Sequence, residues 1–90
     1  MKVIRRTNQF KKDVRRAKKR GKDVQKLKEV IEKLARGETL EARYRDHALG
    51  GPYRGARDCH IEPDWVLIYE TDKEELILIR TGTHADLFNK

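Results

Sequence analysis

Cysteine and long apolar runs are scarce in this chain of 90 residues, and each shortage excludes a class of protein. Cys59 stands alone, so an internal disulfide and a zinc site built on cysteines are both excluded. The longest apolar runs, 65–69 and 76–79, are far shorter than the roughly 20 residues that span a membrane. The N-terminus has no apolar stretch of signal-peptide length. These absences predict a cytoplasmic protein that makes no membrane contact.

Apolar residues are also few, at 37% of the chain against 41% charged residues, but they gather in short blocks. Blocks of this kind allow a small core, so we expect a folded chain rather than a disordered one. The length suits one domain over residues 1–90, and a domain of this size buries roughly 60–65% of the surface of its unfolded chain. We therefore expect no enclosed cavity for a nucleotide cofactor, and no cofactor.

Positive charge is present in excess, with a formal net charge of +7, and it belongs to the first half of the chain. Residues 1–45 hold 17 Lys or Arg and 6 acids, whereas residues 46–90 hold 5 and 9. The densest stretch supplies the expected nucleic-acid contacts: Lys11, Lys12, Arg15, Arg16, Lys18 and Lys19. Such density indicates a phosphate-backbone partner. The alternative is a solvated helix surface that keeps a small protein soluble.

Hydrophobic spacing in the first half predicts a short strand and then two helices. The strand is expected over 2–5. Thr7 or Asn8 can cap a helix that stops at Gly21. Asp23 is the expected cap of a second helix, and Gly37 closes it. The two helices would form a hairpin with an apolar stripe on one face and cations on the other.

Three strands are expected in the second half, over 54–61, 65–69 and 76–81, with connections short enough for hairpins. The predicted fold is therefore α+β: a short N-terminal strand and a two-helix hairpin packed on one face of an antiparallel meander. Because the strands reverse direction twice, His60, Asp64 and His84 should meet at one end of the sheet. A loop could bring His47 to the same end, although nothing in the sequence demands it.

A pair of histidines can supply a general base and a general acid to one reaction. Beside a basic surface, the natural reaction is RNA cleavage, in which one group deprotonates a ribose 2′-OH and another protonates the departing 5′-oxygen. Arg57 or Arg80 could stabilise the charge on the phosphorus intermediate. DNA would be inert because it lacks the 2′-OH. No metal is required, although three histidines with Asp64 could alternatively hold one.

Two aromatic side chains in this region have alternative roles. Trp65 is expected to belong to the core or to contact RNA. Phe88, close to the C-terminus and to His84, could stack on a base. Cys59 is expected to be a small buried thiol.

Three sequence blocks, at 46–49 (DHAL), 57–69 (RDCHIEPDWVLIY) and 78–88 (LIRTGTHADLF), resemble the YafQ branch of the RelE-type bacterial toxins. The resemblance implies a microbial RNase-like α+β fold. It also implies a ribosome-dependent mRNA endonuclease that cleaves messages in the ribosomal A site. A cognate antitoxin would hold the toxin inactive, and operator DNA would be bound only through the complex of the two proteins.

The same resemblance assigns the acid and base roles to His47, His60, Asp64 and His84, with His84 as proton donor to the leaving group. The base role stays open among the other three, and Trp65 and Phe88 would support them or contact RNA. The rival hypothesis is a non-catalytic RNA- or DNA-binding module that acts through the N-terminal helices. A gyrase-poisoning relative is disfavoured, because it would not need the histidines.

Overall fold

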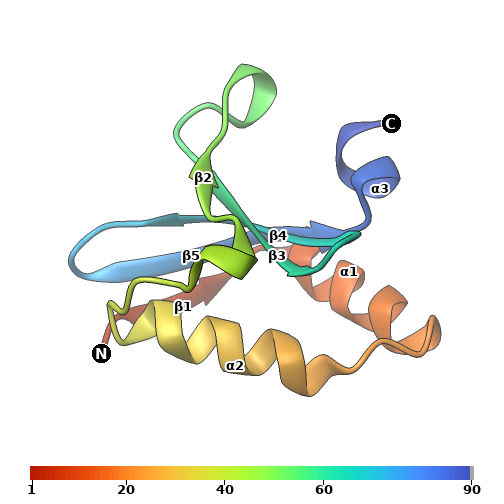
Figure 1. The fold of residues 1–90 in the computed structure, drawn as a ribbon, viewed down its shortest axis with the longest axis horizontal. Helices are drawn as coiled ribbons and strands as arrows, with labels where there is room; N and C mark the ends of the chain where they lie inside the picture. The colour runs from red at the N-terminus through yellow and green to blue at the C-terminus, as the bar shows by residue number, and fades with distance from the viewer. Residues whose placement is uncertain (90) are drawn as a thin grey trace.

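The computed structural model describes residues 1–89, which form a mixed sheet with helices on both faces (Figure 1). The strands are β1 (Val3–Arg6), β2 (His47–Ala48), β3 (Arg57–Glu62), β4 (Trp65–Thr71) and β5 (Glu75–Gly82). The helices are α1 (Asn8–Lys19), α2 (Val24–Ala35) and α3 (His84–Phe88), and two 3₁₀ turns are η1 (Ala42–Tyr44) and η2 (Gly51–Tyr53). No helix within 1–89 is long and apolar enough to cross a membrane.

The helical hairpin begins and ends where the sequence predicts. The Thr7 side chain accepts a hydrogen bond from the backbone N–H of Phe10, and the Asp23 side chain accepts one from Gln25, so both caps satisfy first-turn donors. After each helix a glycine, Gly21 or Gly37, has a positive φ of 80° or 77°. A left-handed residue at this point ends a helix at little cost when it lacks a Cβ.

The sheet has the order β1-β5-β4-β3-β2. The predicted antiparallel meander of β3, β4 and β5 is confirmed, and β2 extends it antiparallel to β3. The short strand β1 pairs parallel with β5, so the sheet is mixed. Parallel neighbours need a long connection, and here it comprises α1, α2 and the strands β2, β3 and β4.

Alternating side chains of β4 enter two separate cores. Trp65, Leu67 and Tyr69 pack beneath α1 and α2, whereas Val66 and Ile68 pack on the opposite face. This period of two is that of a strand buried on both faces.

The second face of the sheet is covered by elements that the periodicity did not reveal. Figure 1 shows the segment with β2 and η2, and the C-terminal helix α3, on the side of the sheet away from α1 and α2. Leu87 of α3 belongs to this smaller core, with Leu49, Tyr53 and Phe88 packed around it. A strand of two residues and a helix of five are too short to show a repeat. The second face matters most, because the histidines lie on it.

Candidate active site

Four chain segments bring the predicted acid–base residues together. His60 lies near the end of β3, and Asp64 lies in the turn that follows it. His84 is the first residue of α3, directly after β5. His47 comes from β2, where it pairs with Asp58 of β3. The convergence expected from strand reversal is present, and β2 adds His47 to it.

His60 and His84 face each other through their Nε2 atoms, which are 3.2 Å apart, with ring centroids 5.2 Å apart. At this distance one nitrogen must donate and the other accept, so the pair favours a single shared proton over two. The geometry thus places one protonated and one bare imidazole nitrogen side by side, as a reaction with one acid and one base requires.

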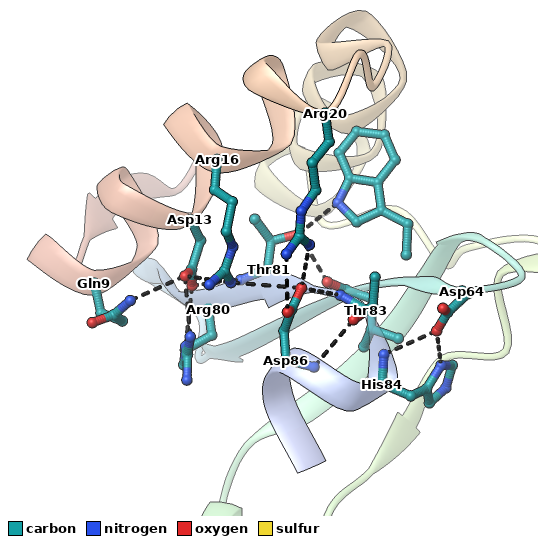
Figure 2. Close-up of polar contacts among 12 residues, drawn as sticks. Gln9, Asp13, Arg16, Arg20, Asp64, Arg80, Thr81, Thr83, His84 and Asp86 are labelled. Carbon is teal, nitrogen blue, oxygen red and sulfur yellow. Dashed lines mark hydrogen bonds and ion pairs between the residues drawn. The ribbon is translucent and has the colours of Figure 1, made fainter. Parts of the chain in front are cut away.

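Asp64 fixes the orientation of His84. One carboxylate oxygen, Oδ1, lies 2.6 Å from the His84 Nδ1 and accepts the His84 backbone N–H at 2.9 Å (Figure 2). The backbone N–H is the main cause that lowers the pKa of the Asp64 carboxyl, followed by the His84 ring. A carboxylate at this place directs the proton of Nδ1 toward itself and turns Nε2 toward His60.

Burial lowers the pKa of His60 below its ordinary value, and nearby His84 and Arg45 act in the same direction. Asp58 opposes this effect, because a carboxylate favours the charged ring. Nδ1 of His60 is buried and has no hydrogen-bond partner. His60 is therefore neutral near pH 7, with Nε2 as its only engaged nitrogen, which is the state a general base needs.

Asp58 is a site residue that the sequence interpretation missed. Its side chain is buried, and burial raises the pKa of its carboxyl despite the opposing effect of His47. Asp58 Oδ1 lies 3.0 Å from His47 Nδ1 but accepts no aligned hydrogen bond. The signal was available, since alternation along a strand puts Asp58 and His60 on the same face.

His47 Nδ1 also lies 2.8 Å from the carbonyl oxygen of Arg45, and the His47 ring stacks on His60 at 6.5 Å between centroids. A proton on Nδ1 directed at that carbonyl leaves the other nitrogen of His47 bare. His47 is thus a second group able to accept a proton, so the geometry leaves the base role open between it and His60.

The two aromatic candidates have different surroundings. Trp65 is 1% exposed, and its Nε1 donates to the Thr81 hydroxyl at 2.9 Å, so the expected contact with RNA is wrong and only its supporting role remains. Phe88 is partly exposed, 6.1 Å from the His84 ring and edge-on to Tyr53 at 5.9 Å between centroids. It lines a cavity of about 620 Å³ together with His47, Asp58, His60 and His84.

The two arginines expected to stabilise the phosphorus intermediate are already paired elsewhere. Arg57 Nε donates to Asp46 at 3.0 Å, and Arg80 donates two hydrogen bonds to Asp13, each of 3.1 Å. Neither arginine lines the cavity beside the histidines. The sequence alone does not show that Asp46 and Asp13 bind these two arginines.

The chain is similar to known proteins in sequence and in structure. Residues 2–89 match the family model described as the bacterial toxin YafQ of a type II toxin-antitoxin system. The mRNA interferase toxin YafQ of Escherichia coli K12 is 48% identical over 83 residues, 91% of this chain and 90% of that protein. The chain belongs to the YafQ family of bacterial toxins.

Solved structures of YafQ toxins have the same fold as this family member. A crystal structure of YafQ from E. coli BL21(DE3) gives a TM-score of 0.93 at 45% identity, covering 98% of this chain and 99% of that one. In an E. coli DinJ–YafQ toxin-antitoxin complex, the matched chain gives 0.90 at 46% identity, with 97% of each chain covered. A metal-bound toxin from Helicobacter pylori gives 0.91 at 37% identity, covering 98% of this chain and all of that one.

In this YafQ-family toxin, residues 1–89 contain no group of three or more His, Cys, Asp or Glu side chains placed to hold a metal ion. The thiol of Cys59 is fully buried, and burial raises its pKa, so it is an inert part of the core. The histidine and acidic side chains that line the cavity are His47, Asp58, His60 and His84.

Not every cation of α1 belongs to the exposed basic surface of the toxin. Lys11, Lys12, Arg15, Lys18 and Lys19 of α1 are exposed. Arg16 instead lies 3.2 Å from Asp13 and 3.6 Å from Asp86, and Arg20 binds Asp86 at 2.6 Å (Figure 2). Arg16 therefore belongs to an ion-pair network with Asp13 and Asp86, and we expect it to contribute less to nucleic-acid docking than the exposed cations of α1.

Proposed function

We propose that this protein cleaves mRNA in the A site of the ribosome by acid–base catalysis at its histidine cluster. As a YafQ-family toxin it is an endoribonuclease of the mRNA interferase class. The observation that carries the mechanism is the pair of Nε2 atoms, 3.2 Å apart, on His60 and His84, with Asp64 behind His84.

His84 acts as the general acid. With Asp64 holding Nδ1–H, protonated His84 donates its Nε2 proton to the departing 5′-oxygen. A neutral imidazole, His60 or His47, takes the proton of the ribose 2′-OH. The 2′-oxygen then bonds to phosphorus as the bond from phosphorus to the 5′-oxygen breaks, which leaves a 2′,3′-cyclic phosphate and a free 5′-hydroxyl. The base ends the step protonated and His84 ends it neutral.

Phe88 gives this site a surface for the substrate. It is an aromatic ring beside the acid, on the rim of a cavity that is open to solvent, and base stacking on such a ring does not depend on sequence. The open cavity cannot align an RNA strand by itself. We propose that the ribosome presents and orients the message, which makes a small and shallow site sufficient.

The exposed cations of α1 (Lys11, Lys12, Arg15, Lys18 and Lys19) are the proposed contact with ribosomal RNA. We further propose that a cognate antitoxin inhibits the protein, as DinJ assembles with YafQ of E. coli. Operator DNA would be bound only through that complex. Action on the ribosome implies a cytoplasmic location.

The direct test is His84→Ala, assayed by cleavage of mRNA on programmed ribosomes. We expect cleavage to slow by about 10²- to 10⁴-fold, the range for loss of an acid–base catalyst. Binding of the antitoxin should be unchanged, which shows that the variant folds. Glu70→Ala, at an exposed position of β4, is the matched control and should cleave normally. Cleavage retained by the His84 variant would refute the assignment.

A further inference from the structure

A second opening reaches His60 from the other side. A groove of about 520 Å³ runs along the edge of β3 between α2 and η1, and Lys26, Glu29, Arg43, Tyr44, Arg45 and Glu62 contribute to its walls. β2 pairs only with the start of β3, so this part of the edge carries no further strand. His60 lines both the groove and the cavity that holds His84. The two openings therefore adjoin at His60.

Arg45 provides the groove with a cation that has a held backbone and an exposed side chain, unpaired among the described residues. Its backbone is left-handed, with φ 48° and ψ 45°, which is uncommon for a residue with a side chain. The Arg45 N–H donates to the Ala42 carbonyl at 3.0 Å, and the Arg45 carbonyl lies 2.8 Å from His47 Nδ1. Within residues 1–89 the guanidinium forms no hydrogen bond or ion pair.

The other cations of the groove are committed to acids. Lys26 lies 3.0 Å from Glu62, and Arg43 lies 3.6 Å from Glu41 and 4.7 Å from the centre of the Tyr44 ring. Glu29, on the α2 wall, would repel an anion. Arg45 is also close enough to lower the pKa of His60, which agrees with a cation near the catalytic ring. A phosphate in the groove should therefore bind on the Arg45 side.

With His60 taken as the base and His84 as the acid, the proposed roles of the histidines set the direction of the RNA. His84 protonates the leaving 5′-oxygen, so the nucleotide on the 3′ side of the cleaved bond lies near His84 and Phe88. The nucleotide that supplies the 2′-OH then lies toward His60, and its own 5′-phosphate continues into the groove. We propose that Arg45 binds this phosphate, one linkage upstream of the cleaved one, which makes the groove a subsite for the 5′ side of the message. This inference rests on the proposed function.

The test pairs a protein variant with a changed message. Arg45→Gln removes the charge at similar length, and a methylphosphonate at the upstream linkage removes the charge of that one phosphate. We expect each change alone to slow cleavage on programmed ribosomes about tenfold, the effect of one charge-assisted hydrogen bond. Both together should slow it about tenfold, not a hundredfold, because each removes the same contact.

Two controls keep the result specific. A methylphosphonate at the linkage downstream of the cleavage site should leave the tenfold effect of Arg45→Gln unchanged. Arg6→Gln, an exposed arginine on β1 at the opposite edge of the sheet, should cleave at the normal rate. Additive losses at the upstream linkage, or coupling to the downstream linkage instead, would overturn the subsite. Failure of the proposed function would differ, because the wild-type protein would not cleave the unmodified message.

Discussion

Two polar clusters lie at opposite sides of the start of α3. They differ in whether their buried polar atoms have hydrogen-bond partners. In the first, Asp13 is 2% exposed and accepts hydrogen bonds from Gln9, Arg16, Arg80 and the backbone N–H of Thr81. In the second, the histidine cluster, Asp58 Oδ1 and His60 Nδ1 are buried without hydrogen-bond partners. Figure 2 shows the first cluster together with Asp64 and His84.

This difference indicates that the first cluster has a structural role and that the histidine cluster is the candidate reactive site. Arg20 and Arg16 hold Asp86, and Asp86 with Thr83 forms the capping box that begins α3. Because His84 lies inside that capped turn, the arginine–carboxylate network fixes the position of the proposed acid. In the histidine cluster, by contrast, His60 Nδ1 and Asp58 Oδ1 are left without hydrogen-bond partners.

The largest expected effect is a loss of stability when the hydrogen bonds of Asp13 are broken. Asp13→Asn removes a buried charge that faces two arginines, and we expect the free energy of unfolding to fall by about 3 kcal/mol. Urea unfolding monitored by circular dichroism measures this change. Glu70→Gln, at an exposed position, should change stability by less than about 0.5 kcal/mol. A loss below about 1 kcal/mol for Asp13→Asn would mean that the network is not a structural support.

A change of pH should affect only the histidine cluster. The lowered pKa of His60 keeps the ring neutral down to a pH below 6.5, so with His60 as the base the fall of the cleavage rate toward acid pH should have its midpoint below pH 6.5. Below the pKa of His60 the rate should fall by up to tenfold per pH unit, because the protonated ring cannot accept a proton. Single-turnover cleavage between pH 5 and 8 gives the profile. A midpoint above pH 6.5 would exclude His60 as the base.

Asp86, which holds the start of α3, should not titrate over the same range. The Arg20 hydrogen bonds hold the pKa of the Asp86 carboxyl well below its usual value. A carboxyl with a depressed pKa in the folded state contributes stability above its ordinary pKa, and this contribution is lost only as pH falls through the depressed value. Circular dichroism should therefore stay constant from pH 8 to 5 while the rate changes.

The smallest expected effect distinguishes exposed cations from paired ones on the same helix. Lys11→Glu with Lys12→Glu should weaken ribosome binding and lower its logarithmic salt dependence by about two, since each lysine contributes about one. Arg16→Gln should leave that salt dependence unchanged, because its guanidinium serves Asp13 and Asp86. Co-sedimentation with ribosomes at several salt concentrations measures both. Equal effects of the two changes would contradict the division of α1 into two roles.

Much of the fold could be predicted because local chemistry determines it. The caps Thr7 and Asp23 act within one turn of their own helix, and the reversals of the meander are encoded by short connections. The same reversals placed His60, Asp64 and His84 together. Strand β2 and helix α3 were not predicted, because they are too short for periodicity and are held by tertiary contacts.

The errors in the candidate site concern pairing across the chain. Arg16 and Arg80 resemble free cations in the sequence, but Asp13, a single acid among many cations, binds both. Nothing in the local sequence states that its carboxylate is buried beneath β5. Asp58 was missed because its importance depends on β2, which brings His47 beside it.

The proposed mechanism is that histidines drive attack by a ribose 2′-OH. It is tested most directly with a message on programmed ribosomes that carries one 2′-deoxynucleotide on the 5′ side of the cleavage site. We predict that cleavage at this linkage is abolished, whereas the unmodified message is cut to leave a 2′,3′-cyclic phosphate. Cleavage of the deoxy-substituted linkage at the normal rate would contradict the account.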